Sequence, residues 1–92
     1  MRLHRNLVFT TIDSLMAIFN EGEYADKVVA RALKKDKRWG SHDRKFVAET
    51  IYEIVRWKRL YTEIAEVKEP FDRDKIWRIF AVWAVLRGYT LP

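Results

Sequence analysis

Apolar residues recur at intervals of three and four positions along almost the whole chain, which is the period of an amphipathic helix. No segment alternates strictly between apolar and polar residues, and only three Gly and two Pro interrupt the pattern. We therefore predict an all-α fold of about five helices, and the length of 92 residues favours a single domain over residues 1–92. The predicted helices cover residues 3–20, 25–35, 41–59, a short segment around 61–67, and 74–87.

The pattern also predicts which side chains of the first and third helices are buried. On the first helix, the predicted core face consists of Leu7, Val8, Phe9, Ile12, Leu15, Met16, Ile18 and Phe19, and the opposite face of Asn6, Thr10, Asp13 and Ala17. On the third helix, the predicted buried arc consists of Phe46, Val47, Thr50, Ile51, Ile54, Val55 and Trp57. Its predicted solvent face consists of Lys45, Glu49, Tyr52, Glu53, Arg56 and Arg59.

The last predicted helix is apolar on every side apart from three cations near its ends. A helix without a polar face is normally surrounded by other elements, which is difficult to arrange in a short chain. We expect part of its apolar surface, including some of Trp77, Phe80 or Trp83, to be exposed. One explanation is that the chain is a piece of a longer protein whose C-terminal part covers this helix. The other is that the helix forms a homodimer interface.

The stretch "WGSHDRKF" at residues 39–46 has the signature of a loop followed by a helix start. We predict that Ser41 is the N-cap, because its hydroxyl can accept a hydrogen bond from an otherwise unpaired backbone N–H. Asp43 then lies in the first turn, where a negative charge complements the helix dipole. Arg44 and Lys45 are RNA contacts at most, and nothing in the stretch is predicted to be catalytic.

The charge balance gives information about binding partners rather than about the fold. Lys and Arg number 18 against 13 Asp and Glu, which gives a net charge of +5 and a pI near 9.7. Such an excess favours nucleic acid as a partner, with an anionic protein or membrane surface as the second choice. The absence of Cys suits a cytoplasmic location, and no apolar run approaches the roughly 18 residues of a membrane span.

No arrangement of residues in the sequence predicts catalysis. His42 and Asp43 are neighbours at a helix start, so their side chains diverge. The pattern contains no Cys–His pair, no metal-binding spacing and no glycine-rich phosphate loop. We therefore expect no catalytic residue, no metal and no cofactor in these 92 residues, and the chain by itself is not expected to be an enzyme.

Binding to RNA is better supported, because cations and aromatic side chains occur near one another in the sequence. The predicted RNA-binding residues are Arg2, Arg5, Lys34, Lys35, Lys37, Arg38, Trp39, Arg44, Lys45, Arg56 and Arg59. Tyr52 is a further candidate stacking surface. A protein-interaction module that docks a partner on the last helix is the alternative. A helix-turn-helix DNA binder ranks last, because "KDKRWGS" exceeds the usual turn of three to four residues.

Residues 23–65, from "EYADKVV" onward, together with "RGYTLP" at the end, resemble one family. This is the NusB-like N-terminal domain of bacterial ribosomal RNA cytosine-5 methyltransferases of the Sun/Fmu (RsmB) type. The matching residues are Ala25, Ala32, Leu33, Asp43, Arg44, Phe46, Tyr52, Val55, Arg56, Gly88, Tyr89 and Leu91. Residues 39–59 and 86–91 carry most of the resemblance, which extends over nearly the whole chain.

The resemblance implies a NusB-like helical bundle, truncated at its C-terminus, that binds ribosomal RNA. It implies a catalytic domain further along the same chain, which binds S-adenosylmethionine and methylates cytosine with paired Cys. Residues 1–92 are then an accessory domain that orients the RNA. We expect this domain to act in the cytoplasm, without contacting a membrane. The first helix of the methyltransferase family often lacks the cluster of Arg2, His4 and Arg5 found here. Arg2 and Arg5 are instead similar to the Arg-rich N-terminus that NusB itself places on RNA.

Overall fold

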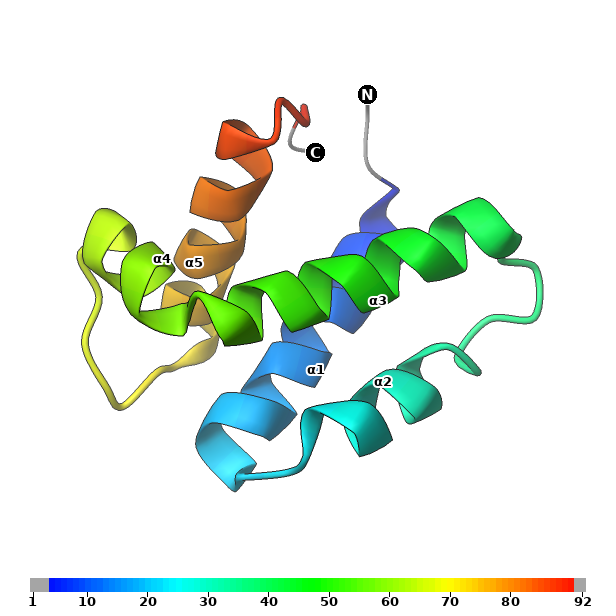
Figure 1. Cartoon of the computed structure of the whole chain (residues 1–92), viewed down its shortest axis with the longest axis horizontal. Helices are drawn as coiled ribbons and strands as arrows, with labels where there is room; N and C mark the ends of the chain where they lie inside the picture. The colour runs from blue at the N-terminus through cyan, green and yellow to red at the C-terminus, as the bar shows by residue number, and fades with distance from the viewer. Residues whose placement is uncertain (1–3, 91–92) are drawn as a thin grey trace.

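The structure of the chain, a computed structural model, describes residues 4–90. It contains five helices, which are α1 (Arg5–Glu21), α2 (Ala25–Ala32), α3 (Ser41–Arg56), α4 (Lys58–Ala65) and α5 (Arg73–Leu86) (Figure 1). None of the described residues lies in a β-strand. The prediction of an all-α fold with about five helices is confirmed.

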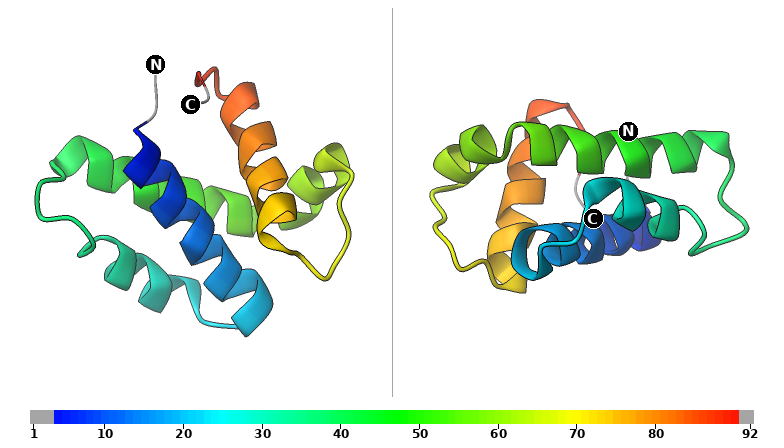
Figure 2. Two further views of the ribbon diagram at one scale, coloured as in Figure 1. Left: turned by 180° about the vertical axis from the view of Figure 1, so that it is seen from behind. Right: turned by 60° about the horizontal axis from the view of Figure 1, so that its bottom comes forward.

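Helix α1 lies at the centre of the bundle, where α2, α3 and α5 all pack against it (Figure 2). Three neighbours bury more of α1 than one amphipathic face, so two residues predicted to face solvent, Thr10 and Ala17, are buried. Phe9, predicted to be in the core, is instead about half exposed. The buried hydroxyl of Thr11 donates to the carbonyl of Leu7 at 2.8 Å, so burying α1 on its polar side leaves this group hydrogen-bonded.

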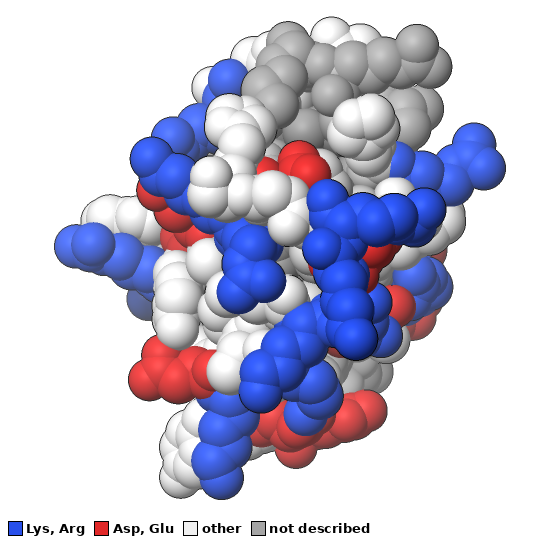
Figure 3. All heavy atoms as spheres, turned by 90° about the vertical axis from the view of Figure 1, so that its right-hand side faces the viewer, with Lys and Arg blue, Asp and Glu red and all other residues white. Residues whose placement is uncertain are grey.

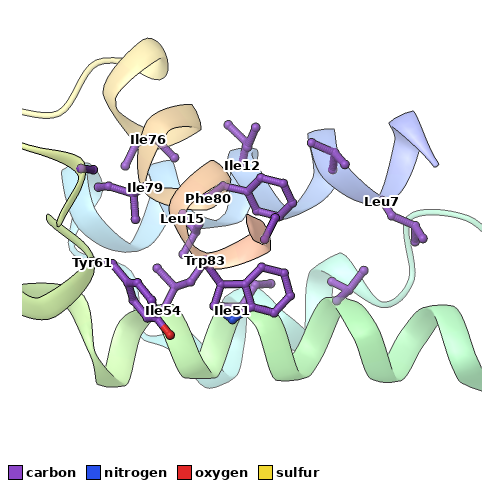
Figure 4. Packing of buried hydrophobic residues seen from close by; sticks show 14 of the residues in the cluster. Leu7, Ile12, Leu15, Ile51, Ile54, Tyr61, Ile76, Ile79, Phe80 and Trp83 are labelled. Atoms are coloured by element: carbon purple, nitrogen blue, oxygen red, sulfur yellow. The ribbon is translucent and has the colours of Figure 1, made fainter. Parts of the chain in front are cut away.

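The core is built where α5 meets α1 and α3. Phe80 and Trp83 of α5 lie among Ile51 and Ile54 of α3 and Ile12 of α1 (Figure 4). Each of these side chains is at most 4% exposed. Such close packing explains why a chain with so many large apolar residues forms one continuous core.

The expectation for the last helix is correct in part. Phe80 and Trp83 are buried and Trp77 is half-buried, whereas Val85 and Leu86 are exposed near the end of α5. The apolar surface left on α5 therefore lies mainly at its C-terminal end. Trp83 stacks on Tyr89 with ring centroids 5.4 Å apart, which closes the core at that end.

Three helix boundaries differ from the predicted ones by three residues, namely the end of α2, the end of α3 and the start of α4. Helix α2 ends at Ala32, so Lys34 and Lys35 lie in the turn that follows it. Helix α3 ends at Arg56 and α4 begins at Lys58, with Trp57 between them at φ −109° and ψ 32°. Because the chain changes direction at Trp57, helical spacing does not place its side chain, and the prediction that Trp57 is buried with the rest of that arc is wrong: the side chain is exposed.

The prediction that Ser41 caps α3 is wrong. Gly40 is the N-cap, with extended backbone, and its carbonyl accepts from the Arg44 N–H at 3.1 Å. Ser41 is the first helical residue and its hydroxyl makes no capping hydrogen bond. Asp43 lies in the first turn, as predicted. Among the described helices, α5 is the one with a side-chain cap, because Asp72 accepts from the Lys75 N–H at 2.8 Å.

Candidate nucleic-acid interface

The positive charge of the protein is concentrated in residues 27–45, which we call the basic end. These residues include eight Lys or Arg and two Asp, an excess of six cations, whereas the net charge of the whole chain is +5. The basic end comprises most of α2, the α2–α3 connection and the first turn of α3, which lie together at one end of the molecule (Figure 1). Figure 3 views the molecule from this side, and Lys and Arg dominate the surface seen there.

Three lysines of the α2–α3 connection are exposed and make no ion pair with any described residue. These are Lys34, Lys35 and Lys37, all of them predicted RNA-binding residues. Their ammonium groups can therefore turn toward a phosphate without first breaking a contact within the protein. That freedom suits sequence-independent binding to a phosphate backbone.

Arg38 is held by its neighbour Asp36. The guanidinium donates to both carboxylate oxygens, at 3.0 and 2.9 Å, and this bond lowers the pKa of the Asp36 carboxyl below its usual value. The Arg38 side chain nevertheless remains 84% exposed. Because Arg38 has donor groups to spare, the pair with Asp36 orients the guanidinium and leaves its outer edge open to solvent.

Arg44 and Lys45, at the start of α3, have different local roles. The Arg44 guanidinium donates to the Leu33 carbonyl at 3.1 Å, at the C-terminal end of α2. A cation there satisfies an otherwise free carbonyl and complements the helix dipole, so Arg44 holds the basic end in shape. Lys45 is exposed and lies 3.9 Å from Glu49, one helical turn further along α3.

A shallow hollow connects the start of α1 with the α2–α3 connection. It is lined by His4, Arg5, Asn6, Leu7, Asp36, Arg38, Trp39 and Asp43. The structure thus brings Arg5 together with Arg38 and Trp39, which are more than thirty residues away in the sequence. Trp39 is half-buried and packs against the core, so at most part of its ring is available to a base. Arg2, also predicted, lies outside the described residues.

Arg56 and Arg59 do not belong to the same cluster. Arg56 follows Lys45 by eleven residues on α3, which corresponds to roughly 17 Å along the helix axis. Arg59 lies beyond the break at Trp57 and pairs with Glu63 at 3.4 Å on the surface of α4. The predicted RNA-binding residues that the structure describes therefore occupy two places, one at each end of α3.

Sequence reasoning overlooked Lys27 and Arg31, which extend the basic end along α2. Lys27 is exposed, and Arg31 is exposed while it pairs with Glu23 at 3.0 Å. They follow the spacing i, i+4, i+8 together with Lys35, so that all three share one face of the helix and the turn after it. That spacing was visible in the sequence and was the signal that could have identified them.

Other kinds of site find little support in residues 4–90. No group of three or more His, Cys, Asp or Glu side chains gathers there in a way that could hold a metal ion. None of the helices described has the length and apolar character needed to cross a membrane. Comparison with known proteins found no matching family model, no matching curated protein and no matching solved structure.

Proposed function

We propose that this chain is an RNA-binding module and that the basic end is its main contact surface. The observation that carries the proposal is the location of the charge. Without residues 27–45 the chain would have ten cations and eleven anions, so the entire positive excess lies in one short segment. A compact group of mobile cations attracts a polyanion and releases the counterions condensed on it.

Several observations favour RNA over the other anionic partners. An amphipathic segment that enters a membrane surface exposes large apolar side chains. The basic end exposes none. Helix α3 packs against α1 along its apolar side, and the connection before it is longer than the turn of a helix-turn-helix motif. The described part of the chain therefore presents no projecting recognition helix that could enter the groove of duplex DNA.

The narrower proposal rests on the resemblance to ribosomal RNA cytosine-5 methyltransferases. On this proposal the RNA is ribosomal, and the domain orients it for a catalytic domain of the same chain that uses S-adenosylmethionine. The residues that carry the resemblance include Asp43 and Arg44, which lie at the junction between the basic end and α3. Catalysis, cofactor binding and methyl transfer then take place outside these 92 residues.

The alternative, a protein-interaction module, is favoured by one observation. Val85 and Leu86 are exposed at the end of α5, where they present aliphatic surface to solvent. A partner or a second copy that covered them would bury this surface. The two functions use different residues of the molecule, so one experiment distinguishes them.

That experiment is a titration of the isotope-labelled domain with a ribosomal RNA stem-loop, followed by NMR amide shifts. We expect the largest shifts in residues 27–45 and at Arg5, with smaller shifts elsewhere. No shifts at low salt would contradict RNA binding. Shifts limited to the end of α5, with line broadening that depends on protein concentration, would support the interaction module instead.

A further inference from the structure

A second hollow lies at the other end of α3, where α4 begins and α5 ends. It has a volume of about 540 Å³ and is lined by Glu49, Tyr52, Glu53, Arg56, Trp57 and Arg87. Two of these residues are large aromatics that remain exposed, Tyr52 at 42% and Trp57 at 48%. Figure 1 shows the helices that carry or adjoin the lining residues, α3 and α5. We call this region the aromatic hollow.

Trp57 is the unusual member of the aromatic hollow. It is the residue between α3 and α4, and its ring belongs neither to the core nor to the half-buried side chains that pack against the core. The Arg56 guanidinium lies 5.4 Å from the ring centroid. An exposed indole beside a guanidinium provides a flat stacking surface and a cation within reach of the same nucleotide.

Among the polar groups of the hollow, Glu53 and Tyr52 are engaged within the protein, whereas Arg56 and Glu49 remain available to a ligand. The Glu53 carboxylate accepts from Arg87 and from the Tyr61 hydroxyl, and the Tyr52 hydroxyl donates to Asp26 at 2.5 Å. Arg56 makes no ion pair with any described residue. Glu49 is exposed, and its one ion-pair contact, with Lys45, is long at 3.9 Å.

The Glu49 carboxylate repels a phosphate, because both groups are negatively charged, but it can accept hydrogen bonds from N–H groups at the edge of a base. Guanine presents adjacent N–H donors, its ring N1–H and its amino group, whereas uracil has a single N–H donor. Glu49 therefore favours guanine over uracil. The same hollow holds the stacking ring and the free cation, so one nucleotide can satisfy all three groups.

We propose that the aromatic hollow binds one unpaired guanine of a single-stranded RNA segment. The base stacks on Trp57, the Glu49 carboxylate accepts from its N–H edge, and Arg56 neutralises the adjoining phosphate. This inference rests on the proposed RNA-binding function and assigns that function a second contact point.

The surface of α3 connects the aromatic hollow to the basic end. Lys45, Glu49, Tyr52 and Arg56 follow one another at steps of four, three and four residues, so they form one stripe along the helix. Its length of roughly 17 Å equals the rise of about five stacked nucleotides at 3.4 Å each. A strand held by its phosphates at the basic end can therefore reach the hollow within a few nucleotides.

The test measures the affinity of the 92-residue chain for eight-nucleotide single strands by fluorescence anisotropy at low salt. The strands are oligouridine, the same strand with one guanine, and the same strand with inosine in its place, which keeps N1–H and lacks the amino group. We expect the guanine strand to bind most tightly. Trp57→Ala should weaken its binding by roughly 5- to 150-fold, the loss expected for one stacking surface.

Two variants keep the test decisive if Trp57→Ala disturbs the fold. Trp57→Phe retains an aromatic ring and should keep most of the affinity, and Glu49→Gln should abolish the preference for guanine over inosine. Tyr24→Ala removes another exposed aromatic, outside the hollow, and should change nothing. Equal affinity of the wild type for all three strands, or of Trp57→Ala and wild type for the guanine strand, would overturn this inference while RNA binding stands. No binding of any strand by the wild type would overturn both.

Discussion

Substitution of Glu53 by Gln tests how the ends of α3, α4 and α5 are held together. The Glu53 side chain is about 25% exposed, and its carboxylate accepts from the Arg87 guanidinium and, at 3.2 Å, from the Tyr61 hydroxyl. Gln has nearly the same size and keeps one oxygen as an acceptor, but it has no charge to offer Arg87. The substitution therefore removes the electrostatic part of the contact and leaves the packing in place.

The size of the effect follows from the partial burial of the pair. Ion pairs between fully exposed side chains contribute about 0.2–1 kcal/mol, and hydrogen bonds to a charged group contribute about 1.5–3 kcal/mol. Because Glu53 is mostly buried and half of the Arg87 side chain is exposed, we expect Glu53→Gln to lower the free energy of unfolding by about 1 kcal/mol. In a domain of this size that corresponds to roughly 4–8 °C in Tm.

The same contact predicts a dependence on pH. The hydrogen bond from Arg87 lowers the pKa of the Glu53 carboxyl in the folded protein, against the opposing effect of burial. The unfolded chain has the usual value of about 4.3, so the unfolded state takes up the proton first as the pH falls. The stabilisation is thus complete well above pH ~4.3 and is lost as the pH falls through the lowered folded-state pKa. The advantage of the wild type over Glu53→Gln should shrink accordingly.

The measurement is urea denaturation followed by tryptophan fluorescence, at pH 7 and again near pH 3. Glu63→Gln is the matched control, because Glu63 makes the same kind of ion pair, with Arg59, but is 67% exposed on the surface of α4. The control should change the free energy of unfolding by less than about 0.5 kcal/mol. Equal midpoints for Glu53→Gln and the wild type at pH 7, or a difference that persists unchanged near pH 3, would refute the reasoning.

Further substitutions test the helix start sites and the core. Asp72→Ala should lower the free energy of unfolding by about 1 kcal/mol, because it removes the side-chain cap of α5. Ser41→Ala should change it by less than about 0.5 kcal/mol, since Gly40 is the N-cap of α3; a larger loss for Ser41→Ala than for Asp72→Ala in urea denaturation would reverse this assignment. Phe80→Ala should cost about 3–5 kcal/mol, because Phe80 is fully buried between Trp77 and Trp83. A denaturation midpoint close to that of the wild type would contradict its place at the centre of the core.

The helical period of the sequence was sufficient to predict the fold class and the approximate position of each helix. It did not predict how many neighbours each helix has. Thr10 and Ala17 are buried because α1 is surrounded by three helices, which no periodicity within α1 reveals. Trp57 is exposed because the chain turns there, and an apolar residue at helical spacing gives no sign of such a turn.

The candidate interface was predictable as far as it is continuous in the sequence. Lys34, Lys35, Lys37 and Arg38 are neighbours in the chain, and they remain neighbours on the surface. The approach of Arg5 to this group depends on how α1 packs beneath the α2–α3 connection, which is a tertiary contact. The pairing of Glu53 with Arg87 likewise joins residues 34 positions apart, which the helical period within α3 does not relate.

Whether the basic end holds RNA by its phosphates can be measured by a salt titration of RNA affinity. It compares the wild type with Lys34→Ala/Lys35→Ala and with a control, Lys68→Ala/Arg78→Ala, which removes two exposed cations elsewhere that make no ion pair with a described residue. The slope of log affinity against log salt is negative, and each lost phosphate contact should make it less steep by roughly 0.7–0.9. We expect the slope to be less steep by roughly 1.4–1.8 for the basic-end variant and unchanged for the control. The same slope for all three proteins, or an equally reduced steepness in both variants, would contradict phosphate binding at the basic end.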